Sequence, residues 1–234
     1  MSYLILMFFS CLVTFEDGEN RTAITFEQAQ TTKSFSNKTP LTSSGKILVM
    51  KDEIILGHGS GNYFRIGKHR FILTAAHVVT DSDTVFLDDG DNYVAADVMH
   101  IDSKLDIAIL VPKHEMKNST AIEYRPNNKK DLTGLSVVYA GYPADLEKSI
   151  FNGMISSCSY NNFSMQSFAL PGASGSVIFD NSGRVLGVLT AIKMSYNALS
   201  PFPQMHPALV YVTRINYYSR KSIRELLVKW KASK

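Results

Sequence analysis

Short runs of β-branched and aromatic residues recur along the chain and are separated by polar or glycine-containing stretches. Such runs are typical of strands, because branched and aromatic side chains fit a pleated, half-buried surface. The runs lie at 46–50, 71–73, 84–87, 135–139, 153–157 and 187–192, with candidate turns at 89–90, 152–153 and 181–183. Many short strands at this spacing predict an all-β fold, either a barrel or a sandwich.

One segment, 219–231, has the period of a helix instead. Its apolar residues follow the i, i+3, i+4, i+7 spacing of a single face, namely Ile223, Leu226, Leu227 and Trp230. Ser222 and Glu225 have the spacing of a capping box, which marks a helix start. The other face is basic, as expected of a solvated helix flank.

Size and charge narrow the class of protein. A chain of 234 residues falls within the range of one all-β unit, and no low-complexity linker divides it. The net charge of +3 is small, so nucleic acid is not an obligatory partner. The two cysteines, Cys11 and Cys158, do not settle the compartment.

The N-terminal 44 residues form a separate segment in this interpretation. Residues 3–13 are apolar and long enough for a signal-peptide core, but shorter than the ~20 residues that a membrane-spanning helix needs. A cleaved or anchoring segment and an internal strand both remain open, and membrane contact is possible only through residues 3–13. If residues 1–15 act as a signal, the protein is secreted or periplasmic; otherwise it is intracellular or viral. Residues 16–44 are polar, as in a flexible arm.

Three segments carry the chemistry of a nucleophilic hydrolase. His77 follows the apolar run 71–73, Asp106 precedes the apolar run 107–110, and Ser174 lies between two glycines. A serine hydroxyl is a weak nucleophile until an imidazole accepts its proton, and the imidazole needs a carboxylate that fixes its tautomer. A charged group beside an apolar run needs such a partner, so we expect Asp106 to be buried and paired.

Gly172 stands two residues before the candidate nucleophile. A glycine there allows a backbone conformation in which the amides of Gly172 and Ser174 point at one spot. Two such donors would form an oxyanion hole, which stabilises the charge that develops during acyl transfer.

The three segments, together with 57–61, 140–143 and 181–187, resemble the motif blocks of the chymotrypsin-like (trypsin-like, clan PA) serine peptidases. They are more similar to the HtrA, glutamyl-endopeptidase and viral branches than to the digestive enzymes. The resemblance runs from about Gly45 to Ile215 and places His, Asp and Ser in the order of that family.

This resemblance implies two antiparallel six-stranded-type β-barrels with the active site between them and a C-terminal α-helix. The peptidase domain would cover 45–234. The parts would be barrel one at about 45–115, a connection at about 112–131, barrel two at about 131–215, and a helix at about 219–231 packed on barrel two. The stretch 57–61 would form a turn before the strand of His77, rather than a phosphate-binding loop.

The resemblance also implies the substrate pocket, which would be built by Phe168, Leu170, Thr190, Ala191 and Ile192. No acidic residue lies at its base, which argues against a demand for Lys or Arg, because a buried ammonium would lack a counter-charge. We expect a small or aliphatic side chain on the acyl side of the cleaved bond, while Lys193 and His206 leave an acidic one open. Ala173 replaces the Asp or Asn that often precedes the nucleophile, so we expect a site that assembles without activation by cleavage.

The sequence therefore predicts a serine endopeptidase that acts on a polypeptide through a Ser174–His77–Asp106 triad and an acyl-enzyme intermediate. Two alternatives stay open: a catalytically silent binding scaffold with the same fold, and a viral or phage maturation protease. No metal or cofactor is expected, since the remaining histidines lack metal-ligand spacing: His58, His69, His100, His114 and His206.

Overall fold

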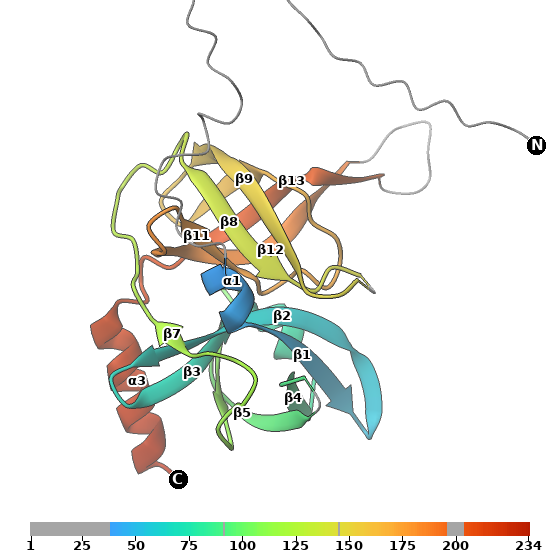
Figure 1. The fold of residues 1–234 in the computed structure, drawn as a ribbon, viewed down its shortest axis with the longest axis vertical. Helices are drawn as coiled ribbons and strands as arrows, with labels where there is room; N and C mark the ends of the chain where they lie inside the picture. The colour runs from blue at the N-terminus through green and yellow to red at the C-terminus, as the bar shows by residue number, and fades with distance from the viewer. Residues whose placement is uncertain (1–37, 91, 145, 196–203) are drawn as a thin grey trace, which may run out of the picture. The chain divides into compact units, whose positions relative to one another are not determined.

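The computed structural model describes residues 38–90, 92–144, 146–195 and 204–234, which form two β-barrels and three helices (Figure 1). The predicted N-terminal signal or anchor at 3–13 and most of the polar arm lie outside the described residues. None of the described helices combines the length and apolar character needed to span a bilayer.

The first barrel is built from six antiparallel strands in the order β1-β4-β5-β6-β3-β2, and it closes through the β1–β2 pair. A seventh short strand, β7, adds to β2 in parallel. The elements are α1 (Lys38–Ser43), β1 (Ser44–Lys51), β2 (Ile54–Ile66), β3 (His69–Thr74), α2 (Ala76–Val79), β4 (Thr84–Asp88), β5 (Tyr93–Asp102), β6 (Ile107–Pro112) and β7 (Ile122–Glu123).

The second barrel closes in the order β10-β13-β12-β11-β8-β9. Its elements are β8 (Ser136–Gly141), β9 (Ser149–Cys158), β10 (Asn162–Gln166), β11 (Val177–Asp180), β12 (Val185–Ser195) and β13 (Gln204–Arg214), and helix α3 (Arg220–Ala232) follows. The prediction of an all-β fold with two antiparallel six-stranded barrels and a C-terminal helix is confirmed.

Aromatic residues fill the core of the first barrel and continue into the second. Phe64 of β2 stacks on Phe71 of β3 with ring centroids 5.8 Å apart, and Tyr124 contacts Phe64 edge-on at 5.3 Å. Phe179 of β11 reaches the same cluster, 6.2 Å from Phe64. All four side chains are buried, so the two barrels share part of one hydrophobic core.

The prediction of a turn at 57–61 is wrong. This segment lies inside β2, where Gly57 pairs with Val49 and Gly61 with Gly45 of β1. Glycine has a low strand propensity, which explains the error. The glycines are needed here because other chain segments approach closely: a Cβ on Gly61 would lie 2.8 Å from Ile47 Cδ1.

The prediction of a turn at 152–153 is also wrong, because β9 runs without interruption from Ser149 to Cys158. Gly153 is required for packing rather than for chain reversal. A Cβ on it would lie 2.5 Å from the carbonyl oxygen of Gln166 and 2.8 Å from Cβ of Ser167.

Helix α3 packs on the first barrel, not on the second as the sequence predicted (Figure 1). Ile223 and Leu227 are fully buried in the first-barrel core cluster, and Arg220 donates a hydrogen bond to the carbonyl of Tyr124 at 2.8 Å. The helix cap also differs from the prediction, since Ser219 rather than Ser222 is the N-cap and its hydroxyl accepts from Ser222 N at 3.1 Å.

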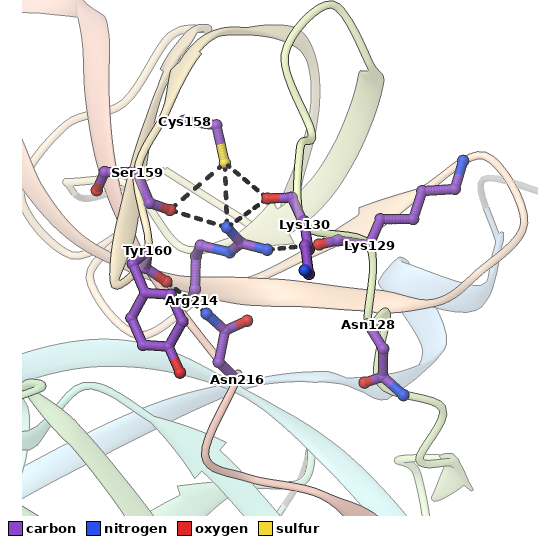
Figure 2. A pocket seen from close by; sticks show the side chains of 8 residues that line it. All are labelled: Asn128, Lys129, Lys130, Cys158, Ser159, Tyr160, Arg214 and Asn216. Atoms are coloured by element: carbon purple, nitrogen blue, oxygen red, sulfur yellow. Dashed lines mark hydrogen bonds between the residues drawn. The ribbon is translucent and has the colours of Figure 1, made fainter.

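A buried arginine joins the connection between the barrels to the second barrel. Arg214, only 4% exposed, donates to the carbonyls of Lys129 (2.6 Å), Lys130 (2.9 Å) and Ser159 (2.8 Å), and lies 3.3 Å from the thiol sulfur of Cys158 (Figure 2). These groups border a cavity of about 630 Å³, which is also lined by Asn128, Tyr160 and Asn216. The guanidinium thus links residues 129–130, in the segment that connects the barrels, to the second barrel through hydrogen bonds to uncharged carbonyl oxygens.

Replacement of Arg214 tests how much these hydrogen bonds stabilise the fold. We expect Arg214→Ala to lower the free energy of unfolding by about 2 kcal/mol, because several charge-assisted hydrogen bonds are lost while water can reach the exposed Lys129 and Lys130. Urea unfolding measures the change. Lys221→Ala, which removes an exposed positive charge, serves as the control, and equal midpoints for the two variants would contradict the assignment.

Asp180, at the end of β11, organises the turn into β12. Its carboxylate accepts from Ser182 N and Oγ, from Arg184 N and from Asn127 Nδ2, at 2.6–3.0 Å. Burial raises the pKa of Asp180, but these hydrogen bonds together outweigh burial and leave the pKa below its ordinary value of 3.8. A carboxyl whose pKa is lower in the folded state stabilises the fold at pH values above the unfolded pKa.

We therefore expect Asp180→Asn to be less stable than the natural protein at pH 7. The difference in free energy of unfolding should shrink as the pH falls below 3.8 through the folded pKa, because the natural carboxyl then also becomes neutral. Denaturant titrations between pH 2.5 and 7 measure this, with Asp81→Asn at an exposed site as the control. A difference that is independent of pH would exclude the ionised carboxylate as its source.

Candidate active site

His77 lies on a single helical turn that follows a buried strand. Strand β3 ends at Thr74, and the small buried residues Ala75 and Ala76 lead into α2. This places His77 at the start of the helix, where its backbone amide has no partner within the helix. The His77 side chain is 47% exposed.

Asp106 satisfies both donors of His77. Its Oδ1 accepts the His77 backbone N–H at 2.8 Å, and its Oδ2 accepts Nδ1–H at 2.7 Å. Asp106 has φ of +53°, a left-handed conformation that aspartate tolerates better than most residues. With Nδ1 donating to the carboxylate, Nε2 is the nitrogen that keeps a free lone pair.

Asp106 was expected to be buried and paired; it is paired with His77, but it is not buried, since its side chain is 30% exposed. Position next to an apolar run does not bury this residue, because the chain turns at Asp106 and only Ile107 and the following residues enter β6. The carboxylate is therefore oriented by its two hydrogen bonds to His77 rather than by enclosure.

Ser174 follows a turn that is defined by a hydrogen bond from Ala173 N to Leu170 O at 3.0 Å. Pro171 and Gly172 occupy the centre of this turn, and Gly172 has φ of +91°. This is the geometry of a type II turn, which favours proline and then glycine at those two positions. Among the described residues, neither Gly172 N nor Ser174 N donates a hydrogen bond, so both amides are free to bind a ligand oxygen.

Strand β2 brings the Ser174 segment close to α2. Ser60 N donates to Ser174 O at 2.8 Å. A Cβ on Gly59 would lie 3.2 Å from the same oxygen and 2.6 Å from a methyl carbon of Val78, the residue after His77. In the described part of the chain, the Ser174 hydroxyl makes no hydrogen bond to His77. Such bonds are often loose in enzymes without substrate.

Three residues outside the predicted set hold the turn at 170–173. Ala144 N donates to Pro171 O at 2.5 Å, and the Ser60 hydroxyl donates to Gly172 O at 2.8 Å. His58 lies against Gly172 and donates through Nε2 to Tyr142 O at 3.1 Å. Of these three residues, His58 and Ser60 lie in the glycine-rich stretch 57–61, for which the sequence predicted a turn, whereas Ala144 lies outside it.

Tyr142 stays neutral beside this turn. Burial, assisted by the negative charges of Asp88 and Glu147, raises the pKa of Tyr142 to about 12. The phenol of Tyr142 is therefore neutral at physiological pH.

The residues predicted to form the substrate pocket lie on the segment before Ser174 and on β12. Phe168 is 45% exposed and its ring lies 6.0 Å from that of Phe151, Leu170 is half-buried, and the Thr190 hydroxyl pairs with that of Thr213 at 3.3 Å. Ala191 is exposed and Ile192 half-buried in β12. A cavity of about 730 Å³ is lined by residues that flank this set, namely Gln166, Ser167, Lys193, His206, Ala208 and Leu209.

Ala173, the residue before Ser174, is fully buried in the core cluster of the second barrel. Its methyl group packs among apolar side chains, so the position holds no ionisable group that could pair with a new N-terminus. Within the described ranges, no cluster of three or more His, Cys, Asp or Glu side chains could hold a metal ion.

Known proteins share both the sequence pattern and the fold. The sequence profile of the family described as "Trypsin-like peptidase domain" matches residues 59–188, more than half of the chain. The chain belongs to the trypsin-like peptidase family. The matched region contains His77, Asp106 and Ser174 together with the strand that carries Ser60.

Among curated relatives of this trypsin-like chain, a "Probable periplasmic serine endoprotease DegP-like" of Brucella suis is 32% identical over 147 residues, 58% of this chain and 28% of the relative. A protein of the same name from Halomonas elongata is 31% identical over 143 residues, 56% of this chain and 29% of the relative. The matches thus span less than a third of each relative.

Solved structures show the fold. The serine endoprotease from Yersinia pestis has a TM-score of 0.64 at 20% identity, over 83% of this chain and 66% of that one. The active form of a protease from M. tuberculosis has a TM-score of 0.58 at 22% identity, over 76% and 80% of the two chains.

Substitution of Gly172 tests the turn. A Cβ there would lie 2.5 Å from both His58 Nε2 and Tyr142 O, at a φ of +91° that alanine disfavours. We expect Gly172→Ala to slow the reaction of Ser174 with a fluorophosphonate by about 100-fold or more, the scale of losing one oxyanion donor. The control is Gly67→Ala, which has φ of +59° and open space around it. Equal rates in the two variants would show that the Gly172 amide is not needed.

Proposed function

We propose that the protein is a serine endopeptidase in which Ser174, His77 and Asp106 form the catalytic triad. The observation that carries this proposal is the double hydrogen bond between Asp106 and His77, close to a nucleophile turn with two free amides, in a chain of the trypsin-like family. The proposal assigns each of the groups that acyl transfer needs, namely nucleophile, base, orienting carboxylate and oxyanion donors, to one of these residues.

In this mechanism, Ser174 Oγ attacks the carbonyl carbon of the scissile peptide while His77 Nε2 accepts the hydroxyl proton. Asp106 holds the imidazole in the correct tautomer and stabilises the imidazolium that forms. The amides of Gly172 and Ser174 bind the oxyanion of the tetrahedral intermediate. The intermediate collapses as His77 gives the proton to the leaving amine, and water then hydrolyses the acyl-enzyme by the same steps.

The proposed substrate is a polypeptide bound in extended form along a strand edge of the second barrel, the mode that supplies backbone hydrogen bonds regardless of sequence. The reaction requires no cofactor, since the protein groups supply base, nucleophile and electrophilic stabilisation. We propose a preference for a small or aliphatic side chain before the cleaved bond. A peptide library that also contains acidic residues at that position tests this preference, because Lys193 lines the neighbouring cavity.

Two other functions predict different results. A silent scaffold would keep the His77–Asp106 pair but leave Ser174 unreactive. A viral or phage maturation protease would cut its own precursor, which N-terminal sequencing of the mature chain would reveal. The form of the turn favours an active site over a scaffold. Gly172 has φ of +91° and its amide makes no hydrogen bond among the described residues, whereas a rotated Pro171–Gly172 peptide would present a carbonyl oxygen in place of this amide.

The decisive experiment is labelling with a fluorophosphonate, followed by peptide hydrolysis. We expect the folded protein to be modified at Ser174 and Ser174→Ala to remain unlabelled. His77→Ala should lose about 10⁵–10⁶ in kcat, as in other triad enzymes in which the base is removed. Ser103→Ala, at an exposed serine near Asp106 in sequence, should behave as the natural protein. Absence of labelling in folded protein, or full turnover by His77→Ala, would exclude the proposed mechanism.

A further inference from the structure

Ser60 of β2 forms hydrogen bonds with the nucleophile segment, by which we mean residues 170–177 around Ser174. No sequence motif indicates these bonds. Its amide donates to Ser174 O, and its hydroxyl donates to Gly172 O at 2.8 Å and accepts from Tyr142 N at 2.9 Å. We propose that Ser60 is a positioning residue whose hydroxyl keeps the turn at 170–173 in the form that presents the Gly172 amide to the substrate. This inference rests on the proposed endopeptidase function.

The turn has an alternative form that would abolish the oxyanion hole. Type I and type II turns differ mainly by a rotation of the central peptide through about 180°. In the observed type II form, the Gly172 N–H is free and the Pro171 carbonyl accepts from Ala144 N. Rotation of the Pro171–Gly172 peptide would bring the Pro171 carbonyl to the place of the Gly172 amide. An oxygen at that place repels an oxyanion.

Ser60 acts on the turn at two points. The bond to Gly172 O anchors the peptide that follows Gly172 and so fixes the end of the turn about which the central peptide would rotate. The bond from Tyr142 N fixes the end of β8, two residues before the Ala144 amide that holds Pro171 O. The hydroxyl therefore anchors one end of the turn and supports the segment whose Ala144 amide opposes the rotation directly.

The surroundings of Ser60 make the hydroxyl hard to replace. The residue is fully buried, and a Cβ on Gly141 would lie 2.9 Å from its Oγ, so the space around the hydroxyl is narrow. The Ser60 carbonyl is itself fixed by the Thr74 hydroxyl at 2.7 Å. Removing Oγ would leave a donor on Tyr142 and an acceptor on Gly172 without partners, which favours a rearranged turn.

A positioning role predicts a specific kinetic pattern. In Ser60→Ala we expect kcat to fall about 10- to 100-fold with KM changed less than about threefold, because the oxyanion forms only in the transition state. A peptide boronic acid, which becomes tetrahedral on the nucleophile, should bind more weakly by a similar factor. A peptide that ends in a primary amide forms no such tetrahedral adduct and should bind about as before.

Ser44→Ala is the matched control. Ser44 is also fully buried, and its hydroxyl donates to Ala140 O of β8 at 3.0 Å, but it does not contact the turn. We expect Ser44→Ala to lose about as much thermal stability as Ser60→Ala, and to keep the natural kcat and the natural affinity for the boronic acid. Ser60→Cys retains a weak hydrogen-bond donor at this position, so its kcat and boronic-acid affinity should lie between those of Ser60→Ala and the natural protein. It serves as the test variant if Ser60→Ala does not fold.

In the kinetic and binding assays, three outcomes would overturn the role of Ser60: a kcat within threefold of the natural value, an equal loss in Ser44→Ala, or a loss of kcat without a loss of boronic-acid affinity. The backbone NMR signal of Gly172 gives a readout that does not depend on catalysis. It should shift in Ser60→Ala and stay in place in Ser44→Ala. A natural protein that neither turns over nor reacts with a fluorophosphonate refutes the endopeptidase proposal, whereas an active natural protein with an unchanged Gly172 signal in Ser60→Ala refutes only the role of Ser60.

Discussion

The candidate site depends on a polar seam between the barrels, because His77 and Asp106 belong to the first barrel and Ser174 to the second. The seam consists of Ser60 and Asn62 of β2, which bond the nucleophile segment directly: Ser60 to Gly172 and Ser174, and Asn62 through its Oδ1 to Val177 N at 3.0 Å. Both side chains are fully buried. Buried polar groups with satisfied partners are directional, whereas apolar contacts are not. The seam therefore fixes the register of Ser174 against α2, which the shared aromatic core alone could not do.

Much of the fold could be predicted from hydrophobic patterns, because strands such as β3, β4 and β8 are short apolar runs that polar or glycine-containing stretches separate. The failures have physical causes. Gly57–His58–Gly59 has little strand propensity, yet pairing with β1 and close approach of the Ser174 segment hold it in β2. The period of α3 predicted a helix with an apolar face, but not which barrel buries that face. A tertiary contact, with Ile223 and Leu227 entering the first-barrel core, decides this.

The candidate site, like the fold, could be predicted from the sequence only in part. The order of His77, Asp106 and Ser174 and their flanking residues singled out three side chains, and the structure brings the first two into contact. Ser60 was not recognised, because its hydroxyl acts on Gly172, 112 residues away, and a single serine between glycines carries no sign of that contact. The pocket residues remain a prediction, because the shape of a substrate pocket depends on how β12, β13 and the segment before Ser174 pack together, which no local pattern describes.

The exposure of His77 and Asp106 indicates how the proposed site would work. A carboxylate in water interacts weakly with a neighbouring charge, because the high dielectric screens it. Asp106 nevertheless keeps a fixed orientation, since both of its oxygens bond His77 and its backbone is held in the left-handed region. An extended peptide laid across His77 would displace water from this pair and strengthen its electrostatic interaction just as the imidazolium forms. Substrate binding would thus complete the environment of the proposed triad, while the seam through Ser60 holds the turn that carries the two proposed oxyanion donors.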